Sequence, residues 1–245
     1  MRNNLVKAIT RLVAGAPLLG AVAVHGNGRN MTQTREPGMT GSSFRVARGV
    51  VVPDLTGIRE GYSTRQRGGY VVFVVNVSAD RIGRVFLELA SIVDPPGFFV
   101  LETPTHFDEE KKLRPTTKEP FHEDVHYLDG ISVARMKDIF QRFGSVLVND
   151  GLASFGFGSH KGRDEVFIGA YKIFYIYADR PDKYRDALGC LGFSEVSELR
   201  TVRENFTPKT PGQLNVLADA SPNIWGVVQT LKGEGLHFAE RREAK

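Results

Sequence analysis

The stretch Ser145-Val-Leu-Val-Asn-Asp-Gly-Leu-Ala-Ser-Phe-Gly-Phe-Gly158 places two apolar runs on either side of Asn149-Asp150-Gly151. Asn, Asp and Gly adopt the positive φ angles of a tight hairpin turn more readily than other residues. The pattern therefore predicts a β-hairpin in which Val146–Val148 pairs back on Leu152–Phe157. We expect the rest of the sheet to assemble on this hairpin.

Four other segments have the composition of strands. Tyr70–Val77 is apolar on both faces, which predicts a central strand. In Glu165–Tyr177 the apolar residues recur with a rough period of two, and Gly169 marks a bulge or turn within the run. Strands are also expected at Phe44–Val52 and Phe98–Glu102, whereas the polar segments 54–69 and 103–120 are expected to be loops.

Apolar residues at helical spacing predict four helices. Each is bounded by capping or helix-breaking residues. The expected boundaries are Ser78 to Asp94-Pro-Pro-Gly97, Ser132 to Gly144, a start at Asp179 and Pro181, and Ser221-Pro222 to the region of Gly233.

These elements predict a single α+β domain over residues 44–232. Its sheet is expected to be mixed and largely antiparallel, with the helices mainly on one face. The order strand, helix, strand from Tyr70 to Glu102 suggests one crossover connection. Residues 233–245 are expected to fray in solvent.

Residues 1–23 have the three parts of a signal peptide in the right order: a basic start, an apolar segment and a small-x-small site at Ala21-Val-Ala23. Cleavage near Ala23 would export the protein to the periplasm, and the shape of the leader is typical of a bacterial protein. The alternative is a cytoplasmic protein that starts at Met31. Residues 24–43 show no periodicity and are expected to be a flexible linker.

The net charge of +4 does not point to nucleic acid, because residues 1–70 hold 10 Lys or Arg against 3 Asp or Glu and the rest of the chain is close to neutral. No stretch is long and apolar enough to span a bilayer. Cys190, the only cysteine, excludes an internal disulfide, and its apolar neighbours predict a small buried side chain rather than a nucleophile.

His122-Glu-Asp-Val-His126 matches the H-E-x-x-H pattern of zinc hydrolases. On a helix, His122 and His126 would hold Zn²⁺ while Glu123 takes a proton from the bound water. The segment is short, however, and has no evident third ligand unless the fold brings His106 or His160 close. Its alternating residues suit a short edge strand at least as well.

The second candidate binding site is the polar connection within Gly156–Arg163. Here Ser159, His160, Lys161 and Arg163 lie beside glycines. Its spacing is neither that of a P-loop nor that of a dinucleotide fingerprint. A polar hairpin connection is the plain interpretation. As a hypothesis, this loop and the 103–120 segment form a recognition surface, because function concentrates in loops held by a rigid scaffold.

The sequence therefore favours a non-enzymatic binding or interaction protein of the immunity or accessory type. We expect it to recognise another protein or a small ligand through polar loops, without a cofactor. The alternative is a zinc-dependent hydrolase that uses residues 122–126. The sequence gives no indication of the partner or the oligomeric state.

Overall fold

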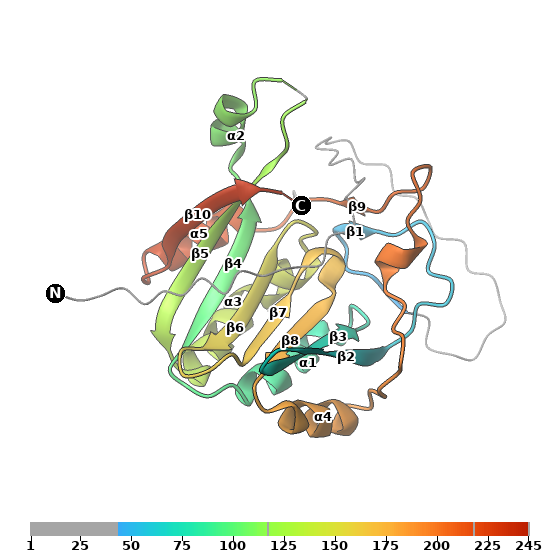
Figure 1. The fold of residues 1–245 in the computed structure, drawn as a ribbon. Helices are drawn as coiled ribbons and strands as arrows, with labels where there is room; N and C mark the ends of the chain where they lie inside the picture. The colour runs from blue at the N-terminus through green and yellow to red at the C-terminus, as the bar shows by residue number, and fades with distance from the viewer. Residues whose placement is uncertain (1–43, 117, 218, 245) are drawn as a thin grey trace.

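The computed structural model describes residues 44–116, 118–217 and 219–244 (Figure 1). The expected signal peptide at 1–23, the linker at 24–43 and the alternative start at Met31 lie outside these residues. In the described chain, no helix is both long and apolar enough to cross a membrane.

One large sheet organises the molecule, and every pairing between its eight strands is antiparallel. A single isolated bridge, between Tyr62 and Glu195, is parallel. A separate two-stranded pair joins β1 (Val50–Val51) to β9 (Gln213–Leu214). In spatial order the large sheet consists of β10 (His237–Glu243), β5 (His122–Ile131), β4 (Gly97–Pro104), β6 (Ser154–Ser159), β7 (Glu165–Ile168), β8 (Phe174–Ala178), β3 (Tyr70–Asn76) and β2 (Gly61–Arg67).

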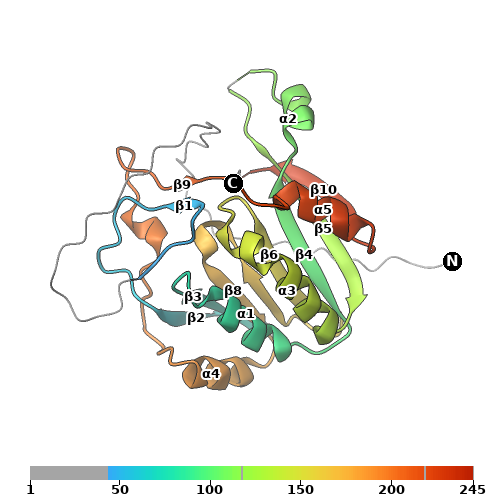
Figure 2. The same cartoon turned by 180° about the vertical axis from the view of Figure 1, so that it is seen from behind.

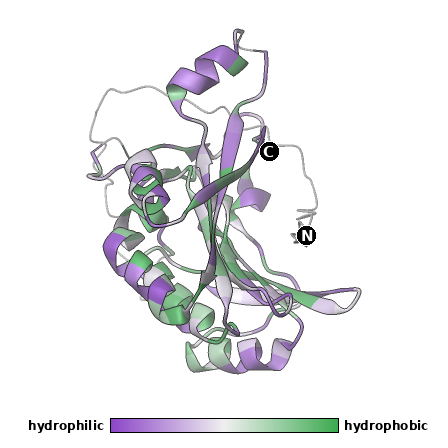
Figure 3. Cartoon of the chain, turned by 90° about the vertical axis from the view of Figure 1, so that its left-hand side faces the viewer, coloured by the Kyte–Doolittle hydropathy of each residue, from purple (hydrophilic) through white to green (hydrophobic). Residues whose placement is uncertain are grey.

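The helices that contribute to the main core all pack on the same face of this sheet (Figures 2 and 3). A further helix, α2 (Phe107–Leu113), stands out from the body and has no buried residue. The fold class predicted above, α+β with a largely antiparallel sheet and helices mainly on one face, is confirmed. The packed helices are α1 (Ile82–Ser91), α3 (Val133–Asn149), α4 (Pro181–Cys190) and α5 (Ile224–Lys232).

The core lies between these helices and the sheet, and aromatic rings fill its centre. The ring of Phe86 in α1 lies 5.2 Å from that of Phe140 in α3 and 5.1 Å from that of Phe155 in β6. Aromatic pairs at such distances stabilise a core beyond the effect of their buried area. Three elements from separate parts of the sequence therefore meet at one ring.

The predicted hairpin at Asn149-Asp150-Gly151 is wrong, because α3 continues to Asn149. Gly144, which we expected to end the helix, lies inside it and makes room for a side chain. A Cβ there would lie 2.8 Å from the ring of Phe140, the same ring that packs on Phe86. Val146 and Leu147 are consequently helical core residues rather than strand residues.

Asp150 ends α3 and joins three segments of the chain. Its buried carboxylate accepts hydrogen bonds from the backbone N–H groups of Leu152 and Ala153, at 3.0 and 3.1 Å, and from that of Leu217 at 3.0 Å. Beside it, a Cβ on Gly151 would lie only 2.0 Å from the carbonyl oxygen of Gly49. The Asn-Asp-Gly signal thus marks a helix end at a close backbone crossing, not a hairpin turn.

Several other boundaries differ from the expectations. The 54–69 and 103–120 segments contain β2 and α2, and the tail expected to fray contains β10, which pairs with β5. Of the expected strand 44–52, only the two residues of β1 form a strand, and β3 is next to the edge of the sheet rather than central.

The helix caps also shift. α1 starts after Arg81 because the hydroxyl of Ser78 instead accepts a hydrogen bond from the backbone of Arg45. α5 is capped by Asn223 rather than Ser221. The Ser132 cap of α3 is confirmed, as is the start of α4 at Pro181.

Candidate binding surface

The loop of residues 159–163 joins β6 to β7 and is held at both ends by buried polar side chains. At one end, the hydroxyl of Ser159 donates to the carbonyl of Asp94 at 2.7 Å and accepts from the backbone N–H of Lys161 at 3.0 Å. At the other end, the carboxylate of Asp164 accepts from the backbone of Asp179 at 3.0 Å and pairs with Lys183. These anchors fix the position of the loop on the sheet.

The exposed side chains of this loop point to different neighbours. The ring of His160 lies 5.3 Å from that of Phe98, and its Nε2 atom lies 3.1 Å from a carboxylate oxygen of Asp129. The guanidinium of Arg163 lies 5.5 Å from the ring centroid of Tyr70. Lys161 is exposed, and its ammonium forms no ion pair with a described residue. The structure therefore brings the four predicted binding residues into one loop, with Ser159 as an anchor and the other three at the surface.

The loop borders the side of the sheet on which none of the four packed helices α1, α3, α4 and α5 lies, and we call this side the helix-free face. The register places Phe98 and Val100 of β4, Val125 and Tyr127 of β5, Phe167 of β7 and Tyr175 of β8 on this face. These six side chains form a hydrophobic cluster of their own, separate from the main core. Sequence reasoning missed this cluster because its members come from four strands.

Two glycines of β6 allow the aromatic rings to lie flat on the helix-free face. A Cβ on Gly158 would lie 2.4 Å from the ring of Phe98, and a Cβ on Gly156 would lie 2.9 Å from the ring of Phe167. Neither approach is possible for a residue with a side chain. The alternation of Gly156 and Gly158 with buried phenylalanines was the sequence signal for this arrangement.

Carboxylates border the aromatic cluster. Glu102 in β4 and Glu123 in β5 both contact the guanidinium of Arg242 in β10, at 2.7 and 3.4 Å. Glu165, at the start of β7, is only 3% exposed and lies on the same face between Gly158 and Tyr177. The helix-free face is therefore apolar at its centre, with Glu102, Glu123 and Glu165 at its border and Arg242 paired with the first two.

The H-E-x-x-H segment forms the first half of strand β5, not a helix. Along a strand, residues four apart are separated by about 13 Å, so His122 and His126 cannot bind one Zn²⁺ ion together. His122 instead lies 3.3 Å from Glu110 of α2, and Glu123 contacts Arg242. The helical arrangement that the hydrolase hypothesis requires is not formed.

The other possible ligands are also dispersed. The ring of His106 lies beside those of Phe107 and Trp225, whereas the ring of His160 lies beside that of Phe98. Within residues 44–244, leaving aside 117 and 218, no group of three or more His, Cys, Asp or Glu side chains could hold a metal ion.

The second histidine of the motif is a core residue. His126 is 3% exposed, and its ring meets that of Phe238 edge-on. Burial, together with the positive charge of Lys232, lowers the pKa of His126. Next to it, burial of Asp124 is outweighed by hydrogen bonds from Arg241 and Thr105, so the pKa of this carboxyl is lowered.

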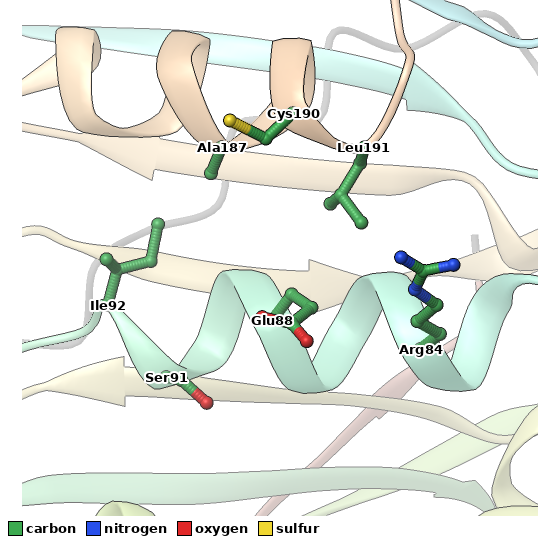
Figure 4. Close-up of a pocket in the computed structure, with 7 residues that line it drawn as sticks. All are labelled: Arg84, Glu88, Ser91, Ile92, Ala187, Cys190 and Leu191. Carbon is green, nitrogen blue, oxygen red and sulfur yellow. The ribbon is translucent and has the colours of Figure 1, made fainter.

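A shallow cavity of about 410 Å³ lies between α1 and α4 (Figure 4). Ala187, Cys190 and Leu191 face Arg84 and Glu88 across it. Cys190 is exposed, so the prediction of a buried cysteine is wrong. Cys190 is the last residue of α4.

Comparisons with protein-family models, with curated proteins and with solved structures find no match to this chain. The function is therefore argued from the geometry of the loop and the face that it borders.

Proposed function

We propose that this protein is a binding protein of the immunity or accessory type, and that the 159–163 loop binds a partner protein. The observation that carries the proposal is the anchoring of the loop. The buried side chains of Ser159 and Asp164 hold its ends through hydrogen bonds, so little conformational entropy is lost when the loop binds. A rigid loop that presents exposed polar side chains is a common form of recognition site.

The charge of the loop indicates the chemistry of the partner. Lys161 and Arg163 are exposed cations of the loop; Arg163 also lies 3.9 Å from the carboxylate of Asp179, and His160 lies 3.1 Å from that of Asp129. Guanidinium and ammonium groups favour carboxylates through charge-assisted hydrogen bonds. The partner is accordingly a protein that presents an acidic patch. Binding of nucleic acid is not part of this proposal, because the basic residues of the body form no stripe with aromatic residues.

The proposal is tested with a double charge reversal, Lys161→Glu with Arg163→Glu, which leaves the anchors Ser159 and Asp164 unchanged. Wild-type and variant proteins are immobilised, and the proteins that each retains from an extract of the native source are quantified. Lys209→Glu is the matched control, because Lys209 is also an exposed lysine in a loop. We expect one acidic protein to be retained by the wild type and the control and lost from the double variant. Equal retention by all three would contradict the proposal.

We also propose that the protein is exported and that its mature chain starts at Val24. The basic, apolar and small-residue parts of residues 1–23 support this. Sequencing the N-terminus of the protein from its native source tests it. A mature chain that starts at Met31 would instead support the cytoplasmic alternative.

A further inference from the structure

Val100 and Val125 lie on the helix-free face, yet they are only 0% and 2% exposed. In the described chain, the apolar residues that pack against them belong to neighbouring strands of the same sheet. The packed helices all lie on the opposite face, as the two opposed views show (Figures 1 and 2). Side chains on an open sheet face remain partly in water, so this degree of burial calls for a covering segment.

We propose that residues 24–43 of the same chain bind across the helix-free face. This inference goes beyond the proposed function and does not depend on it, because the partner-binding residues are those of the 159–163 loop.

The place where the described chain begins supports this assignment. Phe44 belongs to a second hydrophobic cluster, which also includes Val74 of β3 and Tyr175 of β8, and the backbone of the next residue, Arg45, bonds to Ser78 and Ala79 just beyond β3. The register places Val74 and Tyr175 next to each other on the helix-free face. The chain therefore enters the described fold at the margin of the surface that it would cover.

The length of the segment is sufficient. Twenty extended residues reach about 65 Å, at roughly 3.3 Å for each residue. Crossing from β8 to β5 takes four strand spacings of about 4.8 Å, which is about 20 Å. Residues 24–43 can therefore cross the aromatic cluster without strain.

The composition of the segment complements the face. Residues 24–43 contain two arginines, Arg29 and Arg35, and one acidic residue, Glu36, so the segment has a net charge of +1. Arg29 and Arg35 would approach the carboxylates that border the cluster, Glu102, Glu123 and Glu165. Met31 and Met39 are flexible apolar side chains with sulfur atoms that pack favourably on aromatic rings.

The test uses the full chain as purified, with a spin label as a distance probe. Cys190 is first replaced by serine, and Thr32→Cys then carries the label in the middle of the segment. Peak heights of backbone amides are compared by NMR before and after reduction of the label. We expect the amides of Gly156, Gly158 and Glu165 to lose most of their height, while those of α3 and α4 keep theirs.

Two controls make the outcome specific. A label on the native Cys190 should affect α1 and α4 instead of the helix-free face. The double variant Arg29→Glu and Arg35→Glu should restore the peak heights at Gly156 and Gly158, whereas Lys209→Glu, a charge reversal at an exposed lysine outside the segment, should leave the effect unchanged.

The proposal fails if the Thr32→Cys label affects no amide of the helix-free face, or affects all faces alike. It also fails if the loss of peak height appears only between a labelled molecule and a second, isotope-labelled copy, because the segment would then reach a neighbouring chain. The Lys161→Glu, Arg163→Glu variant tests partner binding by the loop separately. The loop proposal and the proposal for residues 24–43 can therefore fail independently.

Discussion

Three buried polar side chains differ in how the fold satisfies them. Lys172 donates to the carbonyl oxygens of Leu147 and Ala153, at 3.0 and 2.5 Å. The hydroxyl of Tyr184 and Nδ1 of His126 are buried and have no hydrogen-bond partner in the part of the chain that the structure describes. An unsatisfied buried polar atom lowers stability, which applies to Tyr184 and His126. For Lys172, burial of the charged group itself affects stability.

Tyr184→Phe removes a hydroxyl that forms no hydrogen bond in the described fold, and burial raises the pKa of this phenol. The ring keeps its place beside Phe73, 6.2 Å away. We expect the free energy of unfolding to stay the same or to rise by up to about 1 kcal/mol. Urea unfolding measures it, and a clear loss of stability would show that the hydroxyl has a partner.

His126 predicts a loss of stability in acid. Burial lowers its pKa in the folded state, so the unfolded chain takes up a proton more readily. The contribution of a neutral His126 is present above the unfolded pKa of about 6.5 and decreases as the pH falls below it. We expect the wild type to be less stable at pH 5 than at pH 7. A His126→Leu variant should show a smaller difference, and an equal difference in both proteins would contradict this account.

Lys172 predicts a gain in stability at alkaline pH. Burial lowers the pKa of its ammonium to about 7, and the negative charge of Asp150 opposes this only in part. Between pH 7 and about 10, the unfolded chain keeps a proton that the folded protein has lost, so rising pH favours the folded state. We expect stability to increase by a few kcal/mol over this window, since one pKa unit corresponds to about 1.4 kcal/mol. The increase should be absent in Lys172→Met.

The expected strands and helices agree with the structure where the sequence of a segment alone decides its conformation. β3 is apolar on both faces, and α4 has proline at its first turn, and both lie close to where they were expected. The edge strands β2 and β10 are polar and were missed, because their extended conformation comes from pairing with β3 and β5. The sequence of an edge strand does not show which strand it pairs with.

The hairpin failed for a related reason. Asn-Asp-Gly is compatible with a turn and with the end of a helix, and long-range contacts select between them. Here the Phe140 ring covers Gly144 and Leu217 donates to Asp150, neither of which the local pattern contains. The H-E-x-x-H pattern failed likewise, because β4 and β10 flank residues 122–126 and hold them in a strand. The polar connection between β6 and β7 was expected from the sequence, since a polar segment between two apolar runs needs no distant partner to form a loop.

Gly151→Ala tests the crossing at the end of α3. A Cβ there would lie 2.0 Å from the carbonyl oxygen of Gly49, so the backbone has to move. We expect a loss of a few kcal/mol of stability, as for overpacking in a core. Gly189→Ala is the matched control, because nothing lies within 4 Å of its Cβ and alanine favours a helix by up to about 1 kcal/mol over glycine. Comparable destabilisation by both substitutions would refute the close crossing.

At the scale of the whole molecule, the two faces of the sheet have different roles. One is covered by α1, α3, α4 and α5 and supplies the main core. The other carries an aromatic and acidic surface with the 159–163 loop at its border. The 159–163 loop therefore presents the candidate binding residues at the border of the helix-free face, where His160, Lys161 and Arg163 are exposed.

Photo-crosslinking tests whether the 159–163 loop contacts a partner protein. A photoreactive amino acid is placed at position 161 in one protein and at position 209 in another, and both are irradiated in an extract of the native source. We expect one crosslinked acidic protein from position 161 and none from position 209. No crosslink from position 161, or the same crosslinks from both positions, would contradict it.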